Sequence, residues 1–336
     1  MISTISDVAK IANVSRATVS RVMNNPSLVS KKTREAVEKA IKELDFHPNQ
    51  LGKKLRQSRS GLIMVLVTNL SSPYFSVVID GIQTTAREYD YDVMLCQDSV
   101  DPQIAASYIR HLKQKTVDGL IIIDNTIDNT LLGDLDYQVY PVVQCSQYCE
   151  NSPIPFVSVD DKAAMKKLVH YLVSTGRKRI ALLNGDRRFI YPKSRLEGYI
   201  EALAECGIDL DESIIRYIDA LTPQHSMIGV NDLFNSKCSF DAIIGVADIF
   251  AVAAIKVAHK NGFRVPQDLS IASFDNTDFT ILSDPSITSI SQPRYDLGVE
   301  SFKMLLERIE DLSSPARQIF LDSDLIIRES TMPIIF

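Results

Sequence analysis

The chain has 336 residues, 45% of them hydrophobic, and a net charge of −6 that is distributed unevenly. Residues 1–60 carry 12 Lys and Arg against 5 Asp and Glu, a charge of +7, and the remaining 24 Lys and Arg and 37 Asp and Glu give −13. Such a composition excludes a disordered chain, and no apolar run approaches the roughly 20 residues that cross a bilayer. A basic module on an acidic body is typical of a protein that places one end against a polyanion.

The basic segment has the pattern of three short helices, which a solvated basic tail would lack. Apolar residues recur at helical spacing through residues 5–22. The sequence TISD has the form of a capping box, in which Thr4 and Asp7 satisfy each other's backbone amides. Asn13 tolerates the left-handed backbone of a tight turn. We expect a first helix to about Ala12, a second capped by Ser15 and running to about Met23, and a third capped by Ser30.

Two helices joined by a turn of about three or four residues form a helix-turn-helix, whose second helix is sized for the major groove of DNA. Arg16, Ala17 and Arg21 fall on the exposed N-terminal face of that helix. Arginine binds guanine O6 and N7 through two hydrogen bonds, and alanine offers an apolar contact to the thymine methyl group. The same arginines could instead contact phosphates or solvent.

The sequence DVAKIANVSRATVSRVMNNP, followed by VSKKTREAVEKAIKELDFHPNQLGKKLR, resembles the N-terminal DNA-binding domain of the LacI/GalR family of bacterial transcriptional regulators. The resemblance continues across nearly the whole chain. It implies that Arg16, Ala17 and Arg21 take the base-reading positions. The residues that it places on DNA phosphates are Ser15, Thr18, Ser20, Asn24 and Thr33.

The segment HPNQLGKKLRQSRSG joins the two parts of the chain. The resemblance implies a hinge helix that enters the minor groove and wedges a leucine between base pairs, and Leu55 matches the wedge position. Lys53, Lys54 and Arg56 suit contacts with the DNA backbone. Gly52 stands where the family usually has alanine, and glycine costs about 1 kcal/mol inside a helix, so we expect disorder in the absence of DNA. A plain flexible linker would have a similar composition.

From Gly61 onward, apolar strands alternate with amphipathic helices, which predicts parallel sheets with helices on both faces. The number of strands indicates two doubly wound subdomains, and this part resembles the periplasmic-binding-protein type I fold. The expected class is therefore α/β, with an all-α helix-turn-helix headpiece in front. We expect the headpiece at 1–46, the hinge and linker at 47–60 and the body at 61–336. Within the body, the N-subdomain is expected at about 61–159 and 291–321, and the C-subdomain at about 160–290 and 322–336.

A ligand of such a body belongs in the cleft between the subdomains, beyond the carboxyl ends of strands. The resemblance places Phe75, Arg195 and Asp275 in this pocket, where an arginine and an aspartate can together bind vicinal hydroxyls. Asp160 and Asp248 also end strands and are further candidates, although these charged residues could equally be caps or structural ion pairs. The other aromatic candidates, which could stack on a ligand or pack in the core, are Tyr74, Phe189 and Tyr191.

The sequences FDNTDFTILSDPSITSISQPRYDLG and LDSDLIIRES resemble the branch of the family that contains the cytidine and purine repressors. This resemblance implies a nucleoside or nucleobase as the effector. However, the purine-type pocket has an arginine and a phenylalanine at the positions that align with Phe189 and Ala220, which speaks against a purine base. A ribonucleoside or a simple sugar remains.

These features predict a sequence-specific transcriptional repressor that binds a pseudo-palindromic DNA operator as a homodimer and responds to a small-molecule effector. The helix from Tyr74 to Tyr89 is our candidate for the dimer contact. Two other classes stay open: a solute receptor of the same body fold, and a doubly wound sugar-modifying enzyme. A receptor would leave the first 56 residues unexplained.

The sequence contains no glycine-rich phosphate loop, nucleophile elbow or H-E-x-x-H motif, and its five His are scattered without metal-ligand spacing. The five Cys include no C-x-x-C pair and are expected to be reduced thiols. The lack of a secretory leader predicts a cytoplasmic protein. We therefore expect no enzymatic activity, no metal and no cofactor.

Overall fold

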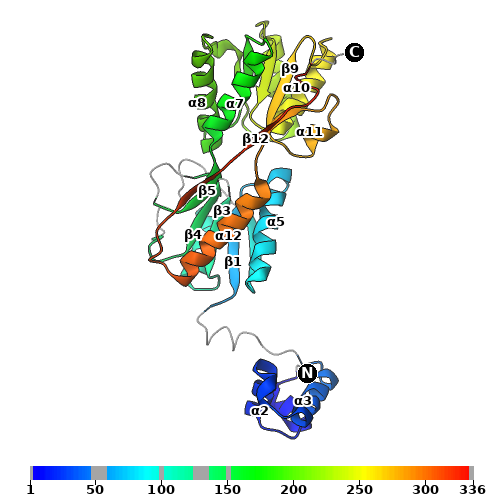
Figure 1. The fold of residues 1–336 in the computed structure, drawn as a ribbon, viewed down its shortest axis with the longest axis vertical. Helices are drawn as coiled ribbons and strands as arrows, with labels where there is room; N and C mark the ends of the chain where they lie inside the picture. The colour runs from blue at the N-terminus through cyan, green and yellow to red at the C-terminus, as the bar shows by residue number, and fades with distance from the viewer. Residues whose placement is uncertain (1–2, 47–58, 98–101, 124–135, 149–152, 333–336) are drawn as a thin grey trace. The chain divides into compact units, whose positions relative to one another are not determined.

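The computed structural model describes residues 3–46, 59–97, 102–123, 136–148 and 153–332. The chain divides into two compact units, Met1–Ser60 and Gly61–Phe336, here called the headpiece unit and the body (Figure 1). The hinge residues Gly52, Lys53, Lys54, Leu55 and Arg56 lie outside the described residues. Among the described helices, none is long and apolar enough to cross a membrane.

The described headpiece consists of α1 (Ile5–Ile11), α2 (Arg16–Asn24), the 3-10 turn η1 (Pro26–Leu28) and α3 (Lys31–Glu43). Thr4 and Asp7 form the predicted capping box, with the Thr4 amide donating to the Asp7 carboxylate at 2.8 Å. Asn13 has a φ of 51°, the left-handed conformation that the turn between α1 and α2 requires. The helices therefore begin and end within one residue of the positions expected from their caps.

The small core of the headpiece forms because each helix buries only one stripe of short apolar side chains. Val8, Val19 and Val37, one from each helix, are completely buried. Phe46 and the partly buried Ile41 and Leu44 close this core from the end of α3. The opposite faces of the helices stay available to a partner.

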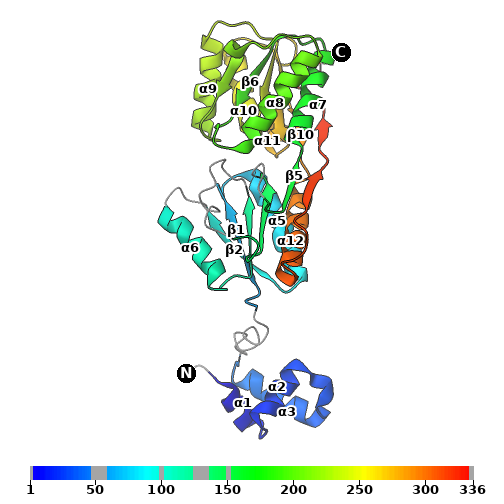
Figure 2. The same cartoon turned by 90° about the vertical axis from the view of Figure 1, so that its left-hand side faces the viewer.

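The body contains two six-stranded sheets within the described residues, each covered by helices on both faces (Figures 1 and 2). The first sheet is wholly parallel, in the order β11-β5-β4-β3-β1-β2. Its strands are β1 (Leu62–Val67), β2 (Asp92–Gln97), β3 (Gly119–Ile123), β4 (Val142–Ser146), β5 (Phe156–Val159) and β11 (Gln318–Leu321). Its helices are α5 (Pro73–Glu88), α6 (Pro102–Lys113) and α12 (Arg294–Glu310). We call this part the N-lobe.

The second sheet has the order β12-β10-β9-β8-β6-β7, with β12 antiparallel to β10. Its strands are β6 (Ile180–Asn184), β7 (Ile215–Tyr217), β8 (Ala242–Gly245), β9 (Ser270–Asp275), β10 (Thr288–Ser291) and β12 (Asp324–Ile326). Its helices are α7 (Asp161–Ser174), α8 (Ile190–Glu205), η2 (Glu212–Ile214), α9 (Pro223–Asn235), α10 (Asp248–Lys260) and α11 (Phe279–Leu282). We call this part the C-lobe.

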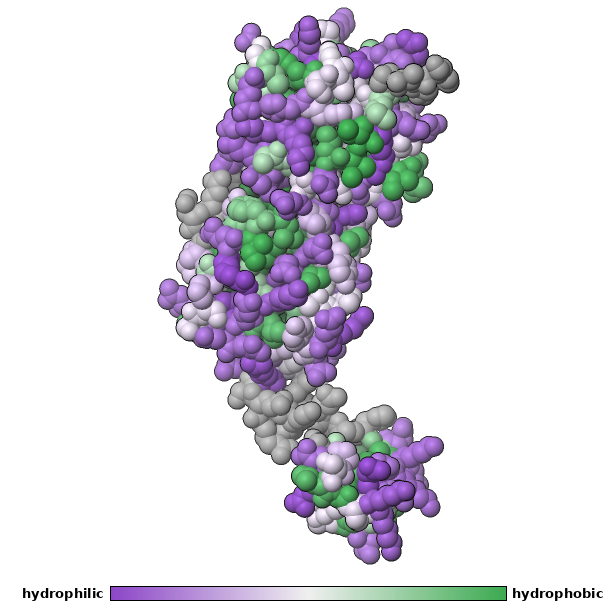
Figure 3. All heavy atoms as spheres, viewed as in Figure 1, coloured by the Kyte–Doolittle hydropathy of each residue, from purple (hydrophilic) through white to green (hydrophobic). Residues whose placement is uncertain are grey.

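The described chain crosses between the lobes where β5 leads to α7, where β10 leads to α12, and where β11 leads to β12. Continuous apolar strands such as β1 and β3 are buried on both faces, as the helix layers require. The surface is mostly polar, with apolar atoms gathered in separate patches (Figure 3). The carboxyl ends of strands from both sheets meet in one region, where a cavity lies.

Candidate DNA-reading face and ligand pocket

The second helix of the headpiece has one buried and one exposed face. Val19 and Val22 pack into the headpiece core, whereas Arg16, Ala17 and Arg21 are exposed. All three predicted base-reading residues therefore lie on the free side of α2, near its N-terminus. Their assignment to bases stays a prediction that this geometry permits.

Three of the predicted phosphate contacts, Ser15, Thr18 and Thr33, lie at helix N-termini. Ser15 Oγ accepts from the Thr18 amide at 3.1 Å, and Ser30 Oγ accepts from the Thr33 amide at 3.3 Å. The N-terminus of a helix favours anions because its first amides and its dipole point toward the ligand. Ser20 is half-buried in α2. The side chain of Asn24, the remaining phosphate candidate, lies outside the described part of the structure.

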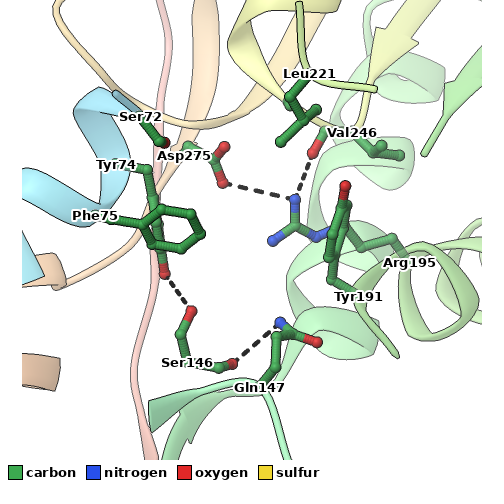
Figure 4. Close-up of a pocket in the computed structure, with 11 residues that line it drawn as sticks. Ser72, Tyr74, Phe75, Ser146, Gln147, Tyr191, Arg195, Leu221, Val246 and Asp275 are labelled. Carbon is green, nitrogen blue, oxygen red and sulfur yellow. Dashed lines mark hydrogen bonds and ion pairs between the residues drawn. The ribbon is translucent and has the colours of Figure 1, made fainter. Parts of the chain in front are cut away.

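A cavity lies between the N-lobe and the C-lobe, at the carboxyl ends of β4 and β9 (Figure 4). Phe75 of α5 and Tyr191 of α8 point into it from opposite lobes. The predicted residues Tyr74, Phe75, Tyr191, Arg195 and Asp275 all line this cavity. The other lining residues are Ser72, Ser146, Gln147, Leu221, Val246 and Ala247.

Arg195 is the central charge of the cavity and is only 3% exposed. Its Nε donates to Asp161 Oδ1 at 2.8 Å, and its Nη1 lies 3.6 Å from Asp275 Oδ1 and also donates to the Val246 carbonyl. The guanidinium carbon lies 3.7 Å above the centre of the Phe274 ring. The buried carboxylate of Asp161 and the partly buried carboxylate of Asp275 thus share one guanidinium.

Burial dominates the electrostatics of both carboxylates. It raises the pKa of Asp275 well above its ordinary value, and it raises the pKa of Asp161, while the charge of Arg195 opposes both shifts. Asp275 has a φ of 105°, a conformation that is strained for a residue with a side chain. A carboxylate accepts hydrogen bonds and a guanidinium donates them, so the two groups together suit a ligand hydroxyl.

The structure places three predicted pocket residues elsewhere. Asp160 caps α7 by accepting from the Ala163 amide at 2.9 Å. Asp248 is buried in the C-lobe and accepts from Ser273, Ser289 and Thr277. Phe189 packs against the C-lobe core, with its ring centre 6.0 Å from that of Tyr191. These contacts give the three side chains structural roles outside the cavity lining, and their part in effector binding stays a prediction.

The sequence interpretation missed Asp161, which directly follows the cap Asp160 and contacts Arg195. It also missed Ser146 and Gln147, although both stand at the end of β4, where the rule of strand ends could have found them. Leu221, Val246 and Ala247 contribute apolar or backbone surface. No sequence motif distinguishes such positions.

A helix-turn-helix headpiece joined to a two-lobed body with a cavity between its lobes defines a ligand-controlled transcriptional regulator. Residues 4–49 match the family described as bacterial regulatory proteins, lacI family, and residues 60–329 match the periplasmic binding proteins and sugar binding domain of LacI family. The chain belongs to the LacI family. The match of residues 4–49 decides against the solute receptor and against the enzyme.

Named relatives agree with this membership. The transcriptional repressor CytR of Escherichia coli is 33% identical over 98% of this chain and 96% of its own. The ribose operon repressor of Halalkalibacterium halodurans is 32% identical over 98% of this chain and 97% of its own. The structure of the Lac repressor dimer bound to operator and an anti-inducer is 26% identical, with a TM-score of 0.89 over 99% of this chain and all of the other.

Proposed function

We propose that this chain is a cytoplasmic homodimeric repressor of a pseudo-palindromic operator whose effector is a ribonucleoside or a simple sugar. The observation that carries the effector class is the Arg195–Asp275 pair, with 3.6 Å between Nη1 and Oδ1, set between the aromatic rings of Phe75 and Tyr191. A guanidinium donates and a carboxylate accepts, so the pair suits neighbouring hydroxyls. The aromatic rings suit the flat face of a sugar or a base.

The names of the relatives support a ribose-containing or related ligand. One relative is named as the ribose operon repressor, and it aligns along nearly the whole chain, as does the transcriptional repressor CytR. Leu221 lines the cavity, next to the position at which Ala220 departs from the purine-type pocket. We therefore favour a ligand whose sugar hydroxyls, rather than a purine ring, provide the recognition.

On the DNA side, we assign base reading to Arg16, Ala17 and Arg21 and phosphate contacts to the α2 and α3 N-termini. The charge of +7 in residues 1–60 supplies the electrostatic attraction. Residues 47–60 would couple the headpiece to the body, with Leu55 as the minor-groove wedge. The similarity to an operator-bound Lac repressor dimer supports assigning the conformation of the body to the DNA-binding state.

We place the twofold contact of the dimer on α5, the helix that the sequence analysis expected between Tyr74 and Tyr89. The face of α5 against α12 is already occupied, so our candidate helix can contribute only its other face. Large apolar side chains that are exposed on the body include Tyr89, Ile281 and Leu282. Apolar patches of this kind are suited to contact with a second copy.

Filter binding over a salt series tests the DNA function. We expect the affinity of the full chain for duplex DNA to fall steeply as salt rises, because counterions are released from each neutralised phosphate. Absent or salt-independent binding would refute the regulator. The probes are genomic promoter fragments, and a scrambled duplex of equal length is the control.

A thermal-shift screen with cytidine, uridine, adenosine, ribose, glucose and cellobiose tests the effector class. We expect a pentose or pyrimidine nucleoside to raise the melting temperature, and Arg195→Ala and Asp275→Ala each to abolish that shift. The matched control is the exposed pair Arg264 and Asp268, 2.7 Å apart, whose alanine variants should keep the shift. If both cavity variants retained the full shift, the pocket assignment would be wrong.

A further inference from the structure

We propose that the body holds a second ligand site, separate from the cavity between the lobes, in which Arg308 binds the phosphate or carboxylate group of a small anionic metabolite. The inference goes beyond the proposed function and does not depend on the effector that occupies the cavity between the lobes. It is carried by a second cavity and by a buried guanidinium that lines it.

The second cavity has a volume of about 570 Å³ and lies in the N-lobe, and we call it the Arg308 cavity. Sites for small molecules commonly measure roughly 300–1,000 Å³. The cavity is therefore large enough for a metabolite of ordinary size. Its lining comes from the segments before β4 and β5, from the last turn of α12 and from the segment after that helix: Tyr137, Gln138, Pro153, Arg308, Leu312, Ser313 and Ala316.

The Arg308 cavity and the cavity between the lobes lie at opposite edges of the N-lobe sheet. Because β4 and β5 are parallel, the segments that precede them meet at the amino-terminal edge of the sheet. The helix α12 ends at the same edge (Figures 1 and 2). Ser146 and Gln147, which line the cavity between the lobes, lie instead at the carboxyl end of β4. The two cavities share no lining residue.

The guanidinium of Arg308 is held at the cavity wall with donors to spare. Arg308 lies in the last turn of α12 and is only 7% exposed. Its Nη1 donates to the Leu312 carbonyl and, at 2.9 Å, to the Ser314 carbonyl, and its Nη2 donates to the Tyr137 carbonyl at 2.9 Å. Its Nε is buried and has no hydrogen-bond partner in the described part of the chain. Three of the five N–H groups are thus used, and arginine binds both oxygens of a carboxylate or a phosphate through two neighbouring N–H groups.

The positive charge of Arg308 is bound only by neutral carbonyl groups among the described residues. The acidic residues close to it in the sequence have other partners. Glu307 pairs with Arg317 at 2.6 Å, and Asp311 accepts from the Ser313 amide at 2.9 Å and from its Oγ at 2.6 Å. Hydrogen bonds from Ser313 are the main cause that lowers the pKa of Asp311, and the charge of Arg308 is a lesser one. A buried charge is costly unless it is paired, so an oxyanion in the cavity would stabilise this guanidinium.

The rest of the lining indicates the class of ligand. Tyr137, Pro153 and Leu312 provide aromatic and apolar surface, and Gln138 and Ser313 provide polar side chains. A mostly apolar wall with a few polar groups and one charge is typical of sites that bind small metabolites. Inorganic phosphate alone would fill only a small part of the cavity. We therefore expect an oxyanion that is attached to a small polar body, as in a sugar phosphate or a sugar acid.

Isothermal titration calorimetry on the full-length chain at constant ionic strength tests this site. The probes are ribose 5-phosphate and gluconate, which separate a phosphate from a carboxylate ligand, with ribose as the uncharged comparison. We expect saturable binding of at least one anion, and the same binding in Arg195→Ala, which alters only the cavity between the lobes. Arg308→Lys keeps the charge but removes the planar fork, so it should bind that anion at least about 10-fold more weakly. The matched control is Arg317→Lys, an exposed arginine paired with Glu307, whose affinity should not change.

Ala316→Glu decides the question even if Arg308→Lys fails to fold, because Ala316 is exposed. The added carboxylate repels an anion in the cavity and should weaken binding at least about 10-fold. Ala316→Gln adds a side chain of the same size without the charge and should bind more tightly than Ala316→Glu. Wild-type affinity in either Arg308→Lys or Ala316→Glu would overturn the inference. So would the loss of binding in Arg195→Ala, which would place the anion between the lobes, or the absence of saturable binding with both anions.

Discussion

Gly81 of α5 and Gly298 of α12 face each other where the two helices cross. A Cβ atom on Gly298 would lie 2.1 Å from the Val78 carbonyl oxygen and 3.1 Å from the Gly81 Cα. A Cβ atom on Gly81 would lie 2.2 Å from the Tyr295 carbonyl oxygen. The absence of both side chains lets the helix backbones touch.

Gly298→Ala should therefore destabilise the body. The new methyl group meets backbone atoms that cannot rotate away, and overpacking of this kind costs about 1–3 kcal/mol or more. We expect the melting temperature to fall by several degrees. The control is Gly229→Ala in α9, whose Cβ would meet only the side chain of Ile218. An equal loss in both variants would show that helix crossing is not the cause.

The fold of the body was predictable because its strands have continuously apolar sequences. The runs LIMVLV and GLIII are continuously apolar, and only strands covered on both faces bury every side chain. The headpiece was predictable from local chemistry, since Thr4, Asn13, Ser15 and Ser30 each act on backbone groups within a few residues. In both cases, residues close together in the sequence determine which element forms.

The pocket was only partly predictable, because its contacts join residues that are far apart in the sequence. Arg195 and Asp275 were found through a family resemblance, whereas Gln292, which donates to Asp275 Oδ1 at 2.7 Å, has no local pattern that marks it. Its partner Tyr74 lies 218 residues away. Asp160 was assigned to the cavity in place of its neighbour Asp161, because a strand end does not reveal which of two adjacent carboxylates caps the helix.

Asp248 gives a pH prediction. Burial raises the pKa of its carboxyl even though Ser273, Ser289 and Thr277 donate to it. A group whose pKa is raised by folding stabilises the protein at low pH. This contribution is lost as the pH rises through the pKa of the group in the folded protein. The side chain of Asp248→Asn cannot titrate. The melting temperature of this variant should therefore lie furthest below that of the wild type near pH 4.5, and the difference should shrink toward pH 8.

Asp268→Asn is the control for this titration. Hydrogen bonds from Arg264 lower the pKa of Asp268 to about 2. A group whose pKa is lowered by folding stabilises the protein at pH values above its pKa in the unfolded chain. This contribution is lost only as the pH falls through its pKa in the folded protein. The deficit of this variant should therefore be flat between pH 4.5 and 8. If the difference in melting temperature between the wild type and Asp248→Asn grew with pH, the hydrogen-bond donors would lower the pKa of Asp248 by more than burial raises it.

Leu55→Ala tests the proposed minor-groove wedge. If the leucine side chain enters a kinked base step, its loss should weaken binding to an operator that the full chain selects from a random pool much more than binding to a random duplex. Competition titrations with both duplexes at one salt concentration measure the ratio. Equal losses on the two duplexes would show that residues 47–60 act only as a linker.

Arg21→Lys separates base reading from phosphate binding. The substitution keeps the positive charge of this exposed α2 residue but removes the planar fork that binds guanine O6 and N7. We expect the slope of log affinity against log salt to stay unchanged, while the preference for operator over random duplex falls by about 1–3 kcal/mol, or roughly 5-fold to 150-fold. Lys39→Gln, on the exposed face of α3, is the charge-removing comparison and should leave the preference intact. If Arg21→Lys left the preference intact while Arg21→Gln reduced the salt slope, the arginine would be a phosphate contact, and base reading would fall to Arg16 and Ala17.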